Sequence, residues 1–158
     1  MDQNEIKNLI KDLIEKTTVN IKEISVAPEG SKNTWFSVEV SEPHFFIDRD
    51  GEGLHALNHV IHRIIESKIR PTTNSPTGLG VLIDINGFQR KHVENVRAVA
   101  HMMSERARYF KSNIEVDPMS AFERRIVHEF LAEANDLKTE SVGFGRTRRV
   151  VIKYTGTI

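Results

Sequence analysis

The stretch Pro118–His128 reads Pro-Met-Ser-Ala-Phe-Glu-Arg-Arg-Ile-Val-His, and it is the main indication of the fold of the second half of the chain. Ser120 followed three residues later by Glu123 is a capping box, which predicts that a helix begins at Ala121. The apolar residues after that point recur at helical spacing and form one stripe: Phe122, Ile126, Val127, Phe130 and Leu131. The stretch therefore predicts an amphipathic helix that buries one face.

Two planar hydrogen-bond donors lie on one side of this predicted helix. Arg124 and His128 are four residues apart, so their side chains stack one turn from each other. A guanidinium and an imidazole in that arrangement suit a phosphate or an unstacked base. A solvent-exposed pair without a ligand is the alternative. Arg125 is a further candidate for phosphate contact, although an ion pair with Glu129, four residues on, also explains it.

A hairpin is predicted between Lys138 and Lys153, because a glycine-containing turn separates two segments of strand type. Three arginines lie close together in it, at Arg146, Arg148 and Arg149. We expect them to neutralise phosphates around the arginine–histidine pair. Because successive side chains of a strand point to opposite faces, only one of the last two faces the helix.

Taken together, these segments resemble the R-3-H (Arg-xxx-His) domain of Jag-type bacterial RNA-binding proteins. The matching residues are Pro118-Met119-Ser120, Glu123-Arg124-Arg125, His128, Thr139-Glu140-Ser141, Gly143, Gly145 and Arg148-Arg149-Val150-Val151-Ile152. The upstream segment Asp84-Ile85-Asn86-Gly87-Phe88 is similar to the one that joins a KH domain to the R-3-H domain in those proteins. The resemblance implies a small α/β R-3-H domain, in which Arg124 and His128 belong to a surface for single-stranded nucleic acid.

The first half of the chain alternates between helical and strand patterns. In order, they predict a helix over residues 4–16, strands around 21–26 and 36–40, a short helix at 45–47, a long helix over 54–65 and a strand over 80–85. Residues 71–80 are rich in Thr, Pro, Gly and Ser and are predicted to form a loop. The long helix is expected to bury Leu54, Leu57, Val60, Ile61, Ile64 and Ile65. This order of elements resembles a KH domain of the bacterial type II topology.

In such a KH domain, the turn between the paired helices carries Gly-x-x-Gly, which lets a nucleic-acid backbone approach the helix N-terminus. The corresponding turn here is Asp48-Arg49-Asp50-Gly51. Asp48 stands in place of the first glycine, and Asp48 and Asp50 put negative charge where phosphates would lie. We therefore expect this half to act as a scaffold or to bind a protein partner, with a residual RNA contact left open.

The boundary between the two halves falls at Asn86-Gly87. After it, apolar residues spaced three and four apart predict a helix of about twenty residues. These residues are Val93, Val96, Ala100, Met103, Ala107 and Phe110. Ile114 and Val116 indicate a short strand. The predicted fold class is α+β, with a divergent type II-like KH domain and its N-terminal helix over residues 1–87 and the R-3-H domain over residues 88–158.

Charge is distributed unevenly along a chain whose net charge is zero. Residues 1–87 carry 9 Lys or Arg against 13 Asp or Glu, whereas residues 88–158 carry 13 against 9. We therefore expect a polyanion to bind the second half. The sequence has no cysteine, no apolar run long enough to span a membrane and no signal peptide in its polar start Met1–Glu5, a pattern typical of a cytoplasmic protein.

The seven histidines raise the question of a metal or catalytic site. His55, His59 and His62 share one arc of the long helix and have a spacing that suits Zn²⁺, but no carboxylate within that arc completes the set. A solvated polar face is the simpler explanation. Around His128 there is no Ser or Cys nucleophile paired with an orienting carboxylate, and no phosphate-binding glycine motif occurs. We expect neither an enzyme nor a bound cofactor.

The expected function is non-catalytic binding of single-stranded RNA or DNA, with RNA the expected target and with His128 and Tyr109 or Phe144 contacting bases. By resemblance, the family is associated with control of cell elongation and envelope growth, beside a small partner that consists of a KH domain alone. A protein-interaction adaptor that has lost RNA binding is the second hypothesis, which the acidic turn favours.

Overall fold

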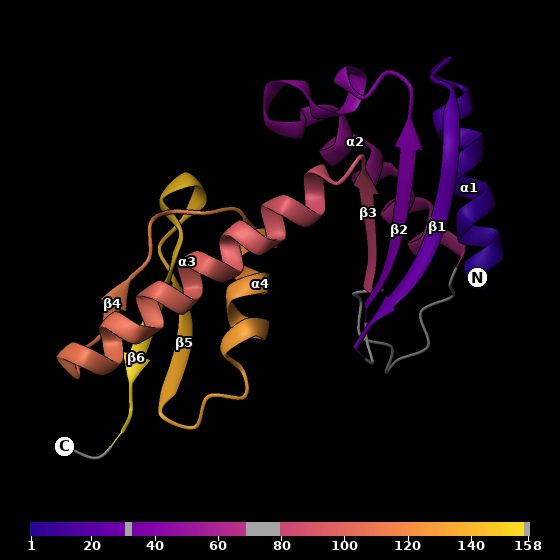
Figure 1. Ribbon diagram of the computed structural model, residues 1–158. Coiled ribbons are helices and arrows are strands. Elements are labelled where there is room, and N and C mark those ends of the chain that lie inside the picture. The colour runs from indigo at the N-terminus through magenta and orange to yellow at the C-terminus, as the bar shows by residue number, and fades with distance from the viewer. Residues whose placement is uncertain (31–32, 69–79, 157–158) are drawn as a thin grey trace. The chain divides into compact units, whose positions relative to one another are not determined.

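The computed structural model describes residues 1–30, 33–68 and 80–156, and these form two compact units (Figure 1). The first unit is Met1–Arg90 and the second is Lys91–Ile158. The predicted loop over residues 71–80 lies outside the described residues, apart from Gly80. Among the described residues, no helix is both long enough and apolar enough to cross a membrane.

The first unit consists of two helices and one three-stranded sheet. Its elements are, in order, α1 (Gln3–Glu15), β1 (Ile21–Glu29), β2 (Asn33–Val40), α2 (His44–Lys68) and β3 (Gly80–Ile85). The sheet has the order β1-β2-β3. β1 and β2 pair antiparallel, whereas β2 and β3 pair parallel because α2 forms the crossover between them.

Helix α2 is interrupted near its start. The backbone of Asp48, Arg49, Asp50 and Gly51 is non-helical, so a short helix and a long helix are separated by a turn. The interruption gives the unit the order helix–strand–strand–helix–helix–strand that the sequence predicts. It also places the acidic turn between the paired helices.

The core of the first unit lies between the helices and one face of the sheet. Helix α1 contributes Ile6, Ile10 and Ile14 to it, at the spacing of one helical face. The remaining buried members are Val19, Phe36, Val38, Val40, Phe46, Leu54, Ile61, Ile65, Val81, Ile83 and Ile85. Val60, which the periodicity assigned to the core, is 45% exposed, so that prediction was wrong.

The second unit packs helices against a second three-stranded sheet. Its elements are α3 (Phe88–Phe110, whose first three residues belong to the first unit), β4 (Ile114–Glu115), α4 (Ala121–Leu131), β5 (Leu137–Val142), the short 3₁₀ helix η1 (Gly145–Thr147) and β6 (Arg149–Tyr154). The sheet order is β4-β6-β5, and both pairings are antiparallel. The predicted hairpin and the predicted α+β fold class are confirmed.

Two aromatic residues depart from the predicted core of this unit. The buried positions of α4 are Ile126, Val127 and Leu131, as expected, but Phe130 is 42% exposed. Phe110, in the last turn of α3, is 62% exposed. That turn is fixed instead by charge, because Arg108 donates to both carboxylate oxygens of Asp136, at 2.7 and 3.0 Å.

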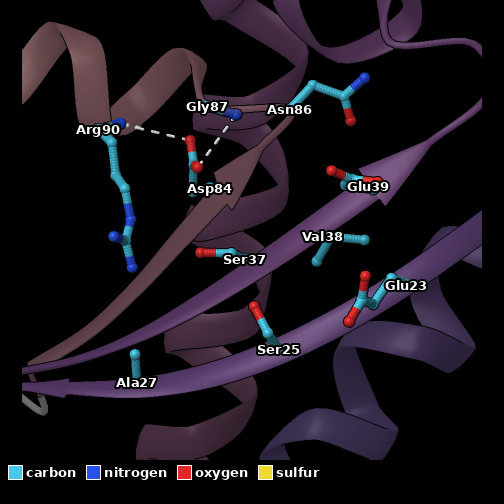
Figure 2. Close-up of a pocket in the computed structure, with 10 residues that line it drawn as sticks. All are labelled: Glu23, Ser25, Ala27, Ser37, Val38, Glu39, Asp84, Asn86, Gly87 and Arg90. Carbon is cyan, nitrogen blue, oxygen red and sulfur yellow. Dashed lines mark hydrogen bonds between the residues drawn. The ribbon is translucent and has the colours of Figure 1, made fainter.

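The step from β3 to α3 depends on a buried carboxylate. Asp84 is 2% exposed, and its oxygens accept hydrogen bonds from the amides of Gly87, Gln89 and Arg90 at 2.8 to 3.3 Å. Three charge-assisted bonds satisfy the carboxylate and cap the first turn of α3. Figure 2 shows two of them as dashed lines.

Candidate nucleic-acid interface

The N-terminus of α4 has the capping box that the sequence predicts. The Ser120 amide donates to the Glu123 carboxylate at 2.6 Å, and the Glu123 amide donates to the Ser120 hydroxyl at 3.2 Å. The amides of Ala121 and Phe122, in the same turn, have no acceptor within the helix. This end of α4 therefore carries partial positive charge.

A shallow hollow of about 570 Å³ lies beside this helix end. Its lining comes from the cap and first turn of α4 and from the tip of the β5–β6 hairpin: Pro118, Met119, Ser120, Ala121, Glu123, Arg124, Gly145 and Arg146. Two sequence-predicted residues, Arg124 and Arg146, are thus brought to one place although they are 22 positions apart. We refer to this hollow as the arginine groove.

Arg124 is held in position by main chain. Its Nη1 donates to the carbonyl oxygen of Met119 at 2.7 Å, and the Met119 amide in turn donates to the carbonyl of Arg148 at 3.2 Å. The guanidinium keeps its other N–H groups for a ligand, because it has five donors.

His128 occupies a different environment from Arg124. Thr139 Oγ1 lies 2.6 Å from its Nδ1, and Ser141 Oγ lies 2.8 Å from its Nε2, so the imidazole joins α4 to β5. Burial lowers the pKa of His128 below its ordinary value, and repulsion from Arg124 adds to the effect. The ring is therefore neutral near pH 7, and both of its nitrogens are bound within the domain.

The other predicted arginines fall into two groups. Arg125 Nε donates to Glu129 at 2.8 Å, which is the ion pair that the sequence offered as an alternative. Arg149 Nη1 donates to Glu115 at 3.3 Å. Arg146 and Arg148 are exposed, and neither is paired with a carboxylate among the residues that the structure describes.

Sequence reasoning missed one component of the groove. Glu123 places a carboxylate in the lining, and His92 Nε2 lies 3.0 Å from its Oε1. The capping box identified Glu123 but gave no sign of this partner, which belongs to α3. The ion pair with His92, when the ring is protonated, reduces the negative charge that Glu123 presents to the groove.

The acidic turn of the first unit has a strained backbone. Arg49, Asp50 and Gly51 all have positive φ, at 53°, 58° and 80°, whereas Asp48 has an ordinary φ of −64°. The position that replaces the expected first glycine therefore needs no glycine. The cost falls on Arg49 and Asp50, since a side chain makes the left-handed region unfavourable.

A second hollow, of about 460 Å³, lies on the sheet of the first unit (Figure 2). Glu23 and Glu39, which line it, are direct partners across β1 and β2, so two like charges face each other. At its other side the Arg90 guanidinium lies 5.1 Å from the centroid of the Trp35 ring. Figure 2 shows the lining side chains on the near face of the strands, with helices behind. The paired carboxylates make this face unfavourable for phosphate.

The three histidines considered for Zn²⁺ do not converge. His55 and His59 are exposed, whereas His62 Nε2 lies 3.0 Å from the carbonyl oxygen of Val81 and is bound within the unit. Over residues 1–30, 33–68 and 80–156, no group of three His, Cys, Asp or Glu side chains is arranged to hold a metal ion.

Comparison with known families identifies the class of the second unit. Residues 94–154 match the R-3-H domain family, so this part of the chain is an R-3-H domain. The match contains the capping box, the Arg124–His128 pair and the hairpin, which are the features that carried the resemblance in the sequence.

The similar curated proteins are bacterial and are named RNA-binding protein KhpB. The chain is 23% identical to that of Bacillus subtilis (strain 168) over 128 residues, which cover 80% of this chain and 59% of the relative. It is 23% identical to that of Clostridium symbiosum over 124 residues, or 78% and 53% of the two chains. For Lactiplantibacillus plantarum the identity is 19% over 137 residues, or 84% and 41%. The resemblance to Jag-type R-3-H proteins is confirmed, and the matches span 41% to 59% of the relatives' length.

Proposed function

We propose that this chain binds single-stranded nucleic acid, with RNA the physiological target, through the arginine groove of its R-3-H domain. The observation that carries the proposal is that Arg124 and Arg146 line one hollow with the N-terminal turn of α4. Guanidinium groups and helix-terminal amides are the donors that bind phosphate oxygens. The relatives' name, RNA-binding protein, supports the choice of RNA.

The mechanism is non-catalytic and electrostatic. A phosphate in the groove accepts hydrogen bonds from the Arg124 guanidinium, whose position is fixed by Met119, and from Arg146 at the hairpin tip. Arg148, exposed beside the tip, neutralises a neighbouring phosphate. For His128 we propose a role other than the base contact expected from the sequence: it positions α4 against β5 through Thr139 and Ser141.

Residues 1–87 are assigned, within the same proposal, to a divergent KH domain that precedes the R-3-H domain at 88–158. The order of its elements and the position of the turn Asp48–Gly51 between paired helices support this assignment. Because Asp48 and Asp50 repel phosphate, this half serves as a scaffold or holds a protein partner, for which a small KH-only protein in the cytoplasm is the candidate. A role in cell elongation and envelope growth follows from the family resemblance alone.

The alternative function is that of a protein-interaction adaptor without RNA binding. It is favoured by the acidic turn and by the facing carboxylates of Glu23 and Glu39 in the first unit. Under this alternative, the arginines of the second unit would carry no ligand.

The deciding experiment measures binding of the full chain to a fluorescent single-stranded RNA by anisotropy. The double substitution Arg124→Gln with Arg146→Gln is expected to weaken binding about tenfold or more, since two charge-assisted contacts are lost. The matched control is Lys11→Gln with Arg63→Gln, which removes the same charge from exposed positions of the first unit. Equal losses in the two double variants, or no binding by the unsubstituted chain, would overturn the proposal.

A further inference from the structure

Phe144, at the tip of the β5–β6 hairpin, is 90% exposed, the highest value among the exposed large hydrophobic residues of the described chain. Leaving a phenyl ring in water forgoes about 1.5–3 kcal/mol of burial free energy. Exposed apolar side chains are common singly and need no explanation by themselves. Phe144, however, combines its exposure with an ordered backbone and with a position next to the arginine groove.

The backbone at Phe144 is held in a hydrogen-bonded turn. The Phe144 carbonyl accepts hydrogen bonds from the Thr147 amide at 3.2 Å and from the Thr147 hydroxyl at 2.9 Å. The Arg148 amide donates to the Gly145 carbonyl at 3.3 Å, which closes the 3₁₀ turn. The tip of the hairpin is therefore an ordered, hydrogen-bonded turn from which the Phe144 ring extends into solvent.

Glycines on both sides of the ring make that turn possible. Gly143 has a φ of +91° and Gly145 a φ of +56°, both in the region that favours glycine. A Cβ at Gly143 would also lie 3.3 Å from the Thr147 carbonyl oxygen. The sequence Gly-Phe-Gly thus holds an exposed aromatic ring between two positions whose backbone conformation favours glycine.

Phe144 also lies next in sequence to the arginine groove. Gly145 and Arg146, the two residues that follow Phe144, line the arginine groove together with Arg124. The backbone that carries the Phe144 ring is thus directly joined to a surface that offers guanidinium groups to phosphate, although the ring itself is not part of the lining. A nucleotide carries a phosphate and a planar base on one sugar, and aromatic rings beside basic grooves are the usual means of binding unpaired bases.

We propose that Phe144 is the base-stacking residue of this surface, and that the ligand is a strand with at least one unpaired base beside a phosphate held in the arginine groove. This inference rests on the proposed function and makes it more specific. A duplex is a poor ligand, because its bases are already stacked and paired. Contact with any base is expected, since every base has a face to stack.

Tyr109 is the competing aromatic, and its surroundings differ. It is 83% exposed on α3, and its ring meets the ring of Phe110 edge to face, with centroids 5.0 Å apart. Neither Tyr109 nor its neighbours in sequence line the arginine groove, whereas Gly145 and Arg146, which follow Phe144, do. Tyr109 therefore provides the matched control, an exposed aromatic of the same unit that the inference leaves without a role.

The test uses tryptophan fluorescence in the full chain. The sequence has a single tryptophan, Trp35, which is 4% exposed and belongs to the first unit. The unsubstituted chain is thus the control, because its emission should stay constant when single-stranded oligouridine is added at low salt. In Phe144→Trp the added indole should be quenched in a saturable manner, as base stacking requires.

A second pair of variants tests affinity. Phe144→Leu keeps an apolar side chain but removes the ring, and it should weaken single-strand binding about tenfold, with the dependence on salt unchanged. Tyr109→Leu should bind as the unsubstituted chain does. Melting temperatures of both variants should match that of the parent, because neither side chain is buried.

The outcomes separate the inference from the proposed function. If the unsubstituted chain binds the strand but Phe144→Trp is not quenched and Phe144→Leu loses no affinity, the stacking role is overturned and the groove remains. If the unsubstituted chain fails to bind, the proposed function itself falls. Vesicles of phosphatidylglycerol form a third arm: a blue shift of the added tryptophan there, without quenching by the oligouridine, would mark the tip as a lipid contact and overturn the inference.

Discussion

The Arg124 guanidinium donates a hydrogen bond to the main-chain carbonyl of Met119, with 2.7 Å between Nη1 and the oxygen. The same Met119 donates its amide to Arg148, so the loop before α4 fixes both the groove arginine and the hairpin. Such a main-chain anchor pre-organises the guanidinium and reduces the entropy that phosphate binding would cost. The arrangement distinguishes Arg124 from the neighbouring Arg125, which is engaged by Glu129.

Arg148 and Arg149 should contribute unequally to RNA binding, although they are adjacent and equally charged. Arg148 is exposed, whereas Arg149 donates to Glu115 at 3.3 Å. In anisotropy titrations over a range of salt, Arg148→Gln should make the slope of log affinity against log salt shallower by about 0.7, the value for one phosphate contact on a single strand. Arg149→Gln should change the slope by less than half as much. The reverse order would show that the Glu115 pair opens on binding.

His128→Ala should reduce stability more than it reduces affinity. The substitution removes the bonds to Thr139 and Ser141, and net hydrogen-bond values put the loss at roughly 1–3 kcal/mol of unfolding free energy. Urea unfolding measures it, and Thr139→Val provides the second side of a double-mutant cycle, in which the two losses should be less than additive. Unchanged stability with a large loss of affinity would mean that His128 contacts the nucleic acid directly.

Stability should also depend on the protonation of His128. Burial holds its folded-state pKa below the ordinary value of 6.5, so below about pH 6.5 the unfolded chain binds more protons than the folded chain. The stability associated with the neutral ring is present above that pH and is lost as the pH falls from 6.5 through the folded pKa. Unfolding free energies at about pH 7.5 and about pH 5.5 should therefore differ more for the parent than for His128→Gln. The other six histidines are the same in both proteins, so equal differences would remove His128 from the explanation.

The sequence predicted correctly those features that depend on residues close together in the chain. The capping box needs only Ser120 and Glu123, and it was right in both hydrogen bonds. The spacing of apolar residues identified the buried side of each long helix, but it could not show where along the helix the packing against other elements ends. Val60 and Phe110 lie on the apolar sides of their helices and are nevertheless exposed for that reason.

Pairs between distant elements carried no signal in the sequence. The contact of Glu123 with His92 joins residues 31 positions apart, and that of Arg149 with Glu115 joins residues 34 apart. The arginine groove itself exists only because the hairpin returns to the start of α4. Positive φ at Arg49 and Asp50 was equally hidden, since only a few per cent of non-glycine residues adopt that region.

Gly51 should be far less tolerant of substitution than Gly87. Their φ values are nearly equal, at +80° and +82°, so alanine costs similar backbone strain at both. At Gly51, however, the added Cβ would lie 2.5 Å from Cε1 of Phe88, whereas at Gly87 nothing lies within 4 Å. Gly87→Ala should cost about 1 kcal/mol and Gly51→Ala about 1–3 kcal/mol more, from overpacking. Chemical unfolding of both variants measures the difference, and equal costs would show that Phe88 yields easily.

The proposed binding of nucleic acid at the arginine groove can be located residue by residue from amide chemical shifts. The ¹⁵N-labelled full chain would be titrated with a short single-stranded RNA and its shifts followed residue by residue. We expect the largest changes over Ser120–Arg124 and Gly143–Arg148, with little change in the acidic turn Asp48–Gly51. Changes concentrated in that turn, with the amides around the groove unmoved, would contradict it.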